Sequence, residues 1–135
     1  MTDFPITIFH NPACGTSRNV VAIVEAAGYA PKVVEYLQAG WTGEQLLDLA
    51  ARAGLTLGEL IRAKGTQAEA LGLLADGVPD ERILEAMVAD PILVNRPIVL
   101  TPKGAALCRP SEAVLVLLDR RPEHFAKEDG EVVIP

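Results

Sequence analysis

Cys14 is the residue of this sequence with the clearest capacity for chemistry, and it lies between a strand pattern and a helix pattern. Residues 6–9 alternate in the manner of a strand, and residues 17–27 carry apolar side chains at helical spacing. A thiol at the start of a helix faces backbone N–H groups without helical partners and the positive end of the helix dipole. Both favour the thiolate, so we expect a lowered pKa for Cys14 and a nucleophilic sulfur near neutral pH.

The residues directly after Cys14 suit an oxyanion beside the sulfur. Gly15 allows close approach of the backbone, and the N–H groups of a first helical turn bind anions. Thr16 and Ser17 offer hydroxyl donors, and Arg18 adds a positive charge. We therefore expect Gly15, Thr16 and Ser17 to contact an anionic substrate.

Each of the two cysteines has an alternative role as a small buried residue, which is the usual environment of a free cysteine. For Cys14 the neighbouring residue types argue against burial because they favour an exposed turn: Pro12, Gly15, Ser17 and Asn19. Cys108 could be a second thiol that forms a disulfide with Cys14. A packed strand residue is favoured instead, since nothing in the sequence brings the two sulfurs within bonding reach.

His10 stands at the end of the first strand, four residues before Cys14. It could hydrogen-bond to the turn and stabilise the thiolate, or it could be a half-exposed histidine at a strand end, and the sequence leaves both open. A metal site formed by His10 and Cys14 is disfavoured because two further ligands are missing. We expect no metal.

A βαβ unit is expected to position Cys14 at the end of its first strand. Strand 6–9, helix 17–27 and strand 32–37 follow one another with short connections, which predicts that the two strands are parallel.

A ββα unit is predicted near the other end of the chain. Strands 98–101 and 105–108 flank a tight turn, and a helix over 112–118 follows them. The polar tail, about 122–135, is expected to be loosely attached, with Phe125 as a candidate anchor.

The middle of the chain has only helical patterns. The segments Thr42–Gln45 and Thr56–Glu59 are both capping boxes, and Asp80 is expected to cap a longer helix. A βαβ unit and a ββα unit that share one mixed sheet form the α/β arrangement called thioredoxin-like. We expect one such domain over residues 1–135, with a helical insertion at about 42–90.

Three arginines at widely separated positions are candidates for binding an oxyanion: Arg62, Arg96 and Arg109. A planar guanidinium holds a tetrahedral oxyanion through several charge-assisted hydrogen bonds. In a thioredoxin-like fold the loop before the third strand packs beside the first helix, which would bring Arg96 and Arg109 to Cys14. Pro97 is a candidate cis proline. The alternative is that all three are ordinary surface arginines.

Composition narrows the classes of function. A net charge of -6 disfavours binding to nucleic acid or to an anionic membrane surface. Two distant cysteines form neither a disulfide framework nor a CxxC motif, which is typical of a reducing cytoplasm. The chain starts without a signal-peptide pattern, and no apolar run approaches the ~18 residues of a membrane span. We expect a cytoplasmic monomer.

Four segments in order resemble the glutaredoxin-coupled arsenate reductases. They are residues 10–19, 94–99, 107–112 and 125–131 (HNPACGTSRN, VNRPIV, LCRPSE and FAKEDGE). The similarity extends over nearly the whole chain, from about residue 6 to residue 133. The chain departs from the family pattern directly after Arg62, where Ala63 and Lys64 stand in place of the expected Lys and Asn.

The resemblance implies a thioredoxin-like core with a single catalytic cysteine. It implies that Cys14 attacks arsenate, that His10 assists the thiolate, that the three arginines hold the oxyanion, and that the peptide bond before Pro97 is cis. Glutathione would then attack the Cys14–arsenic adduct as co-substrate, and glutaredoxin would reduce the mixed disulfide. This activity contributes to arsenic detoxification and needs no bound cofactor.

Two other functions are compatible with this fold. A glutathione-dependent thiol transferase needs the thiol and a cis proline but no arginine cluster. Redox-responsive regulators that bind RNA polymerase usually carry CxxC at the helix start, and here the fourth position of that motif is Ser17. Arsenate-dependent oxidation of NADPH in a coupled glutathione–glutaredoxin assay distinguishes the three.

Overall fold

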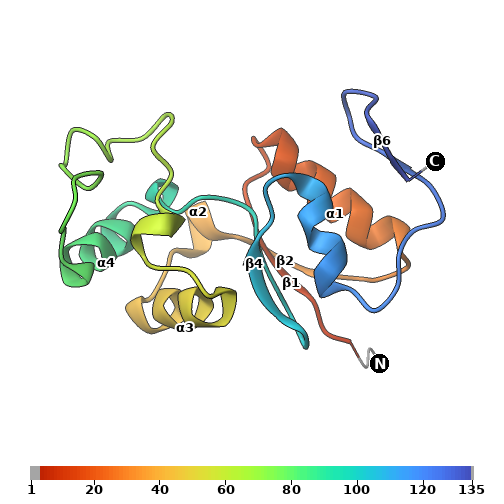
Figure 1. Ribbon diagram of the computed structural model, residues 1–135, viewed down its shortest axis with the longest axis horizontal. Helices are drawn as coiled ribbons and strands as arrows, with labels where there is room; N and C mark the ends of the chain where they lie inside the picture. The colour runs from red at the N-terminus through yellow and green to blue at the C-terminus, as the bar shows by residue number, and fades with distance from the viewer. Residues whose placement is uncertain (1–3, 135) are drawn as a thin grey trace. The chain divides into compact units, whose positions relative to one another are not determined.

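The computed structural model describes residues 4–134, which form two compact units (Figure 1). The first unit comprises residues 4–35 and 96–134. Its elements are β1 (Thr7–His10), α1 (Gly15–Ala26), β2 (Lys32–Glu35), β3 (Ile98–Thr101), β4 (Gly104–Leu107), η3 (Ser111–Leu117), β5 (Phe125–Ala126) and β6 (Val132–Ile134). The second unit comprises residues 36–95. Its elements are α2 (Tyr36–Ala39), α3 (Gly43–Ala53), η1 (Gly58–Leu60), α4 (Asp80–Ala89) and η2 (Pro91–Leu93).

A four-stranded mixed sheet in the order β2-β1-β3-β4 forms the centre of the first unit. Strand β1 is parallel to β2, with Ile8 opposite Val33, and antiparallel to β3, with Ile8 opposite Val99. Strands β3 and β4 form a hairpin in which Val99 faces Ala106. The parallel βαβ unit and the hairpin predicted from the sequence are both confirmed.

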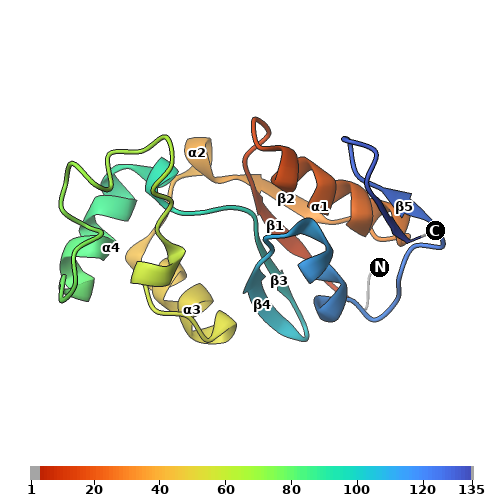
Figure 2. The ribbon, with the colours of Figure 1, turned by 45° about the horizontal axis from the view of Figure 1, so that its top comes forward.

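One face of this sheet is covered by α1 and η3, which pack against each other (Figure 2). Side chains alternate between the two faces of a strand, so Ile8 and Val99 point to the same side. There they form one apolar cluster with fully buried residues of α1 and η3, which include Val20, Ile23 and Val114. Helix α1, whose first turn follows Cys14, is therefore held firmly on the sheet.

The second predicted strand is shorter than expected, because β2 ends at Glu35 and Tyr36 begins α2. Tyr36 is fully buried, and its hydroxyl donates to the carbonyl oxygen of Val94 at 3.0 Å. Its ring centroid lies 5.1 Å from that of Trp41. The alternation of residues 32–37 does not reveal that Tyr36 has a buried hydrogen-bond partner 58 positions away.

The helical patterns of the middle segment are confirmed with small shifts. The capping box at Thr42 and Gln45 is present. Helix α3 ends at Ala53, and its C-cap residue Gly54 has a φ of 68°, in the left-handed region that favours glycine. Thr56 and Glu59 also exchange reciprocal hydrogen bonds, but only the 3₁₀ turn η1 follows them. Asp80 is the first residue of α4 rather than its cap.

The C-terminal segments also depart from the predictions. The last helix, η3, is a 3₁₀ helix that begins at Ser111. The tail was expected to be loosely attached, but β5 and β6 form an antiparallel hairpin. Phe125 packs against the apolar cluster of the sheet, as predicted. Among the described residues 4–134, no helix is both long and apolar enough to cross a bilayer.

Truncation of an α1 side chain that packs against the sheet tests the packing of α1 on the sheet. Ile23→Ala should lower the free energy of unfolding by about 2–5 kcal/mol, because it opens a cavity at a fully buried position. Val116→Ala on η3 is the control, since that side chain is 72% exposed. Urea denaturation followed by circular dichroism measures both. Equal midpoints for the two variants would contradict the packing described here.

Candidate active site

Cys14 is the N-cap residue of α1 and closes a tight turn after β1. Its backbone N–H donates to the carbonyl oxygen of Asn11 at 3.0 Å. The side-chain oxygen of Asn11 accepts from the N–H of Ala13 at 2.9 Å. The cysteine has an extended backbone, with φ −100° and ψ 122°, which suits a residue that enters a helix. The predicted position of the thiol at a helix start is confirmed.

The turn is more buried than the sequence predicted. Ser17 is fully buried, Asn11 is 3% exposed and Cys14 is 9% exposed. The expectation that Cys14 lies in an exposed turn is therefore wrong: Cys14 is buried, although its sulfur contacts Arg109 rather than the apolar cluster on the sheet. The buried residues of this turn include polar groups that are paired: the Ser17 hydroxyl accepts a hydrogen bond from the Asn11 N–H at 3.1 Å.

His10 is linked to the turn through Ser17. Its Nδ1 atom lies 2.6 Å from the Ser17 hydroxyl. Burial lowers the pKa of His10, Glu35 partly opposes this effect, and Arg18 adds to it. The net effect favours the neutral imidazole. The path from His10 to the thiol runs through Ser17, whose backbone N–H faces the Cys14 sulfur.

The topology of the sheet explains why two arginines meet the thiol. Phe9 near the end of β1 pairs with Ile98 at the start of β3, and Ile98 pairs with Leu107 at the end of β4. The loop after β1, the loop before β3 and the loop after β4 therefore emerge at the same end of the sheet. These loops carry Cys14, Arg96 and Arg109.

Arg109 and Arg96 both reach the Cys14 sulfur. Nη1 of Arg109 lies 3.6 Å from the sulfur and also donates to the carbonyl oxygen of Arg96 at 3.0 Å. The side chain of Arg96 hydrogen-bonds to the sulfur as well. The Arg96–Pro97 bond is cis, as predicted, and the Arg109–Pro110 bond is cis too. The predicted convergence of these two arginines on Cys14 is confirmed.

The environment of Cys14 changes its acidity in two opposing directions. Burial raises the pKa of the thiol, but the backbone N–H of Ser17 and the guanidinium groups of Arg96 and Arg109 outweigh it. The net effect lowers the pKa of Cys14 to about 7. A large fraction of this cysteine is thus a thiolate at neutral pH.

Cys108 has the opposite environment. It is fully buried in the apolar cluster, and burial raises the pKa of its thiol to about 12. Its backbone N–H donates to the carbonyl oxygen of Pro97 at 2.9 Å, directly after β4 ends at Leu107. The favoured prediction of a small packed residue is confirmed, but Cys108 lies directly after β4 rather than within the strand expected over 105–108.

The remaining predicted residues have contacts that do not test a role in binding. Arg62 belongs to the second unit, where its Nε donates to the carbonyl oxygen of Lys64 at 3.3 Å, and its approach to an oxyanion stays a prediction. Thr16 accepts a hydrogen bond from Ser111 at 3.2 Å through its carbonyl oxygen. Gly15 begins α1. Contacts of Gly15, Thr16 and Ser17 with a substrate stay predictions.

Two residues near the site have roles that the sequence did not predict. Asn11 accepts the hydrogen bond from Cys14 that closes the turn, and Glu128 pairs with Arg18. Glu128 forms an ion pair with Arg18 at 2.8 Å across 110 positions of the chain. No periodicity connects positions so far apart. The only available signal was that Glu128 lies in one of the four segments that resemble the family.

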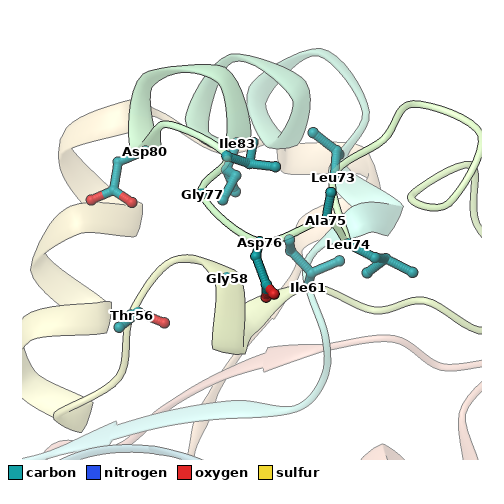
Figure 3. A pocket seen from close by; sticks show the side chains of 11 residues that line it. Thr56, Gly58, Ile61, Leu73, Leu74, Ala75, Asp76, Gly77, Asp80 and Ile83 are labelled. Atoms are coloured by element: carbon teal, nitrogen blue, oxygen red, sulfur yellow. The ribbon is translucent and has the colours of Figure 1, made fainter.

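A separate cavity of about 370 Å³ lies in the second unit (Figure 3). Its lining includes Thr56, Ile61, Asp76 and Asp80. Two carboxylates would repel an oxyanion, so this cavity is not a rival anion site. Residues 4–134 contain no group of three or more His, Cys, Asp or Glu side chains arranged to hold a metal ion.

The fold and the site define a class of protein, a thioredoxin-like α/β protein with one reactive thiol beside two arginines. The sequence profile of the ArsC family matches residues 9–117. The chain is 58% identical over 135 residues to an arsenate reductase of Synechocystis sp., covering 99% of this chain and 94% of that protein. It is 46% identical over 130 residues to the arsenate reductase of Escherichia coli K12, covering 96% and 92%.

A solved structure agrees with this likeness. The arsenate reductase from Vibrio cholerae superimposes with a TM-score of 0.82 at 34% sequence identity, covering 87% of this chain and 100% of that chain. The chain belongs to the ArsC family.

Alkylation of the two cysteines tests the electrostatics of the site. The rate of reaction of Cys14 with iodoacetamide should rise with pH and give an apparent pKa of about 7. Arg109→Ala should move this pKa upward, because the thiolate loses a positive neighbour. Mass spectrometry should find Cys108 unmodified in the folded protein. An apparent pKa near 9 for Cys14 in the wild type would contradict the described site.

Proposed function

We propose that this protein is an arsenate reductase in which Cys14 attacks arsenate and glutathione supplies the reducing thiol. The observation that carries the proposal is the buried Cys14 sulfur with a pKa of about 7, in contact with Arg109. The names of the relatives support the same substrate.

The arginines answer an electrostatic problem of this reaction. Arsenate and a thiolate are both anions, so they repel each other unless positive charge is already in place. The N-terminus of α1 contributes only about half a unit of positive charge. Arg96 and Arg109 supply the rest, and their planar donors orient the oxyanion for attack. We propose Arg62 as a third group on the same anion.

The first chemical step forms a bond between the Cys14 sulfur and arsenic, and one arsenate oxygen leaves as water after protonation. Backbone N–H groups of Gly15, Thr16 and Ser17 bind the remaining oxygens at the helix start. His10 acts through Ser17, whose buried hydroxyl holds the turn in place. Arsenic keeps its oxidation state in this step.

The second step transfers two electrons to arsenic. The glutathione sulfur attacks the Cys14 sulfur, a disulfide bond forms, and the sulfur–arsenic bond breaks with its electron pair left on arsenic. The products are arsenite and a mixed disulfide of Cys14 with glutathione. A glutaredoxin thiol then attacks the glutathione sulfur of this disulfide and releases Cys14 as a thiol.

An external thiol is needed because the chain has no suitable second one. Cys108 is fully buried with a pKa of about 12, so it supplies no thiolate near neutral pH. Both cysteines are free thiols. The cytoplasm, where glutathione keeps thiols reduced, is the compartment that fits this cycle.

Replacement of each cysteine tests the proposal that one protein thiol suffices. Cys14→Ser should abolish arsenate-dependent oxidation of NADPH in the coupled glutathione–glutaredoxin assay. Cys108→Ala should keep most of the activity, because it only removes one buried sulfur. A folded but inactive Cys108→Ala would refute the single-thiol mechanism, and full turnover with thioredoxin alone would refute the need for glutathione.

Replacement of the arginines tests their action on the anion. Arg96→Ala and Arg109→Ala should each lower kcat/KM for arsenate roughly 10²-fold or more, since loss of one preorganised donor costs about 2–4 kcal/mol. Arg→Lys at either position should restore activity only in part, because an ammonium lacks the bidentate fork. The control is Arg121→Ala, an exposed arginine after η3, which should behave as the wild type.

A comparison of substrates separates this proposal from a general thiol transferase. At a pH high enough to ionise Cys14 fully in every variant, the arginine variants should keep any activity on a neutral disulfide substrate while they lose activity on arsenate. An equal loss on both substrates, or none on arsenate, would show that the arginines do not bind the oxyanion.

A further inference from the structure

Arg18, near the start of α1, connects the C-terminal hairpin to the turn that carries Cys14. Its Nε and Nη2 atoms donate to the two carboxylate oxygens of Glu128, at 2.8 and 3.0 Å. Its Nη1 atom donates to the carbonyl oxygen of Pro12 at 2.8 Å. One guanidinium therefore holds the hairpin and the residue two positions before Cys14 at the same time.

The hairpin that carries Glu128 is itself anchored. The backbone N–H of Glu128 donates to Asn19 Oδ1 of α1 at 3.0 Å. The neighbouring Lys127 forms ion pairs with Glu112 of η3 at 2.8 Å and with Glu131 at 3.0 Å. Glu128 is thus presented to Arg18 by a segment held at several points of the first unit.

The free energy that this ion pair adds to folding is expected to be small. The side chains of Arg18 and Glu128 are 43% and 51% exposed, and exposed ion pairs contribute little to stability. A Cβ placed on Gly15 would lie 3.7 Å from Glu128 Oε1. A carboxylate beside the helix start is favourable to the helix dipole, but it competes with an anion that binds there. The contacts also have a geometric effect on the turn, which substitutions can separate from the effect of charge.

We propose, on the basis of the proposed attack of Cys14 on arsenate, that Arg18 and Glu128 are positioning residues for this reaction. The pair ties the Pro12 carbonyl to the hairpin and so fixes turn 11–14, which aims the Cys14 sulfur. On the other side of the turn the Cys14 N–H is bound to Asn11. Both the Arg18 contact and the Asn11 contact are needed to keep the sulfur in one position. Small misplacements of a reacting group lower the rate strongly.

Two substitutions separate geometry from charge. Arg18→Lys keeps the positive charge, but one ammonium cannot hold both carboxylate oxygens and the Pro12 carbonyl. Glu128→Gln removes a negative charge at nearly constant size. Each should lower kcat for arsenate about tenfold, with KM changed less than about twofold. The double variant should be no slower than either single one, because both remove the same connection.

Glu131→Gln is the matched control. It makes the same change of charge on the same hairpin, and its partner Lys127 keeps Glu112. We expect wild-type kcat. Thermal melting curves of all variants establish that the chain is folded.

The pH dependence of Cys14 alkylation by iodoacetamide is a readout independent of arsenate. If the connection aims the sulfur at the Ser17 N–H and at Arg96 and Arg109, both Arg18→Lys and Glu128→Gln should raise its apparent pKa. Charge alone would leave Arg18→Lys unchanged and lower the value in Glu128→Gln. That pattern, or wild-type kcat in both variants, would overturn the proposal. A wild type that does not reduce arsenate would refute the proposed function, and the alkylation would still decide the positioning role.

Discussion

The chemistry proposed for this protein requires two anions to approach each other, the Cys14 thiolate and an oxyanion. Two unit charges 4 Å apart interact by about 4 kcal/mol at an effective dielectric constant of 20, so this repulsion must be offset in advance. The chain as a whole carries a net charge of -6 and worsens the problem. The offset is therefore local: the start of α1, Arg96 and Arg109 are assembled around one sulfur.

Assembly of like charges has its own cost, and the fold reduces it. Nη1 of Arg109 donates to the carbonyl oxygen of Arg96, so the negative end of a backbone dipole faces one of the two positive charges. The antiparallel hairpin β3–β4 brings their positions together, and pairing of β3 with β1 places them at the Cys14 turn. A rigid apolar cluster under α1 then keeps the helix start in place. Secondary structure, packing and electrostatics thus depend on one another at this end of the sheet.

The sequence predicted the features that depend on local pattern and strand order. The position of Cys14 before a helix follows from periodicity, and the meeting of Arg96 with Cys14 follows from the topology. The features that the sequence did not predict depend on contacts between distant positions that share no pattern. These are the contacts of Tyr36 with Val94 and of Arg18 with Glu128. Burial of Ser17 was missed because serine is common both in exposed turns and at buried hydrogen-bonded positions, and its residue type alone does not distinguish the two.

The seclusion of Cys108 has a consequence for damage by oxidants. Peroxides attack thiolates that solvent can reach, and higher oxidation products of cysteine are irreversible. Cys108 is fully buried with a pKa of about 12, so of the two cysteines only Cys14 is open to oxidants in the folded protein. A sulfenic acid on Cys14 condenses with glutathione to the same mixed disulfide that forms in the proposed cycle. Oxidative injury at the early stage thus re-enters turnover, and the enzyme would be repaired by its own reductant.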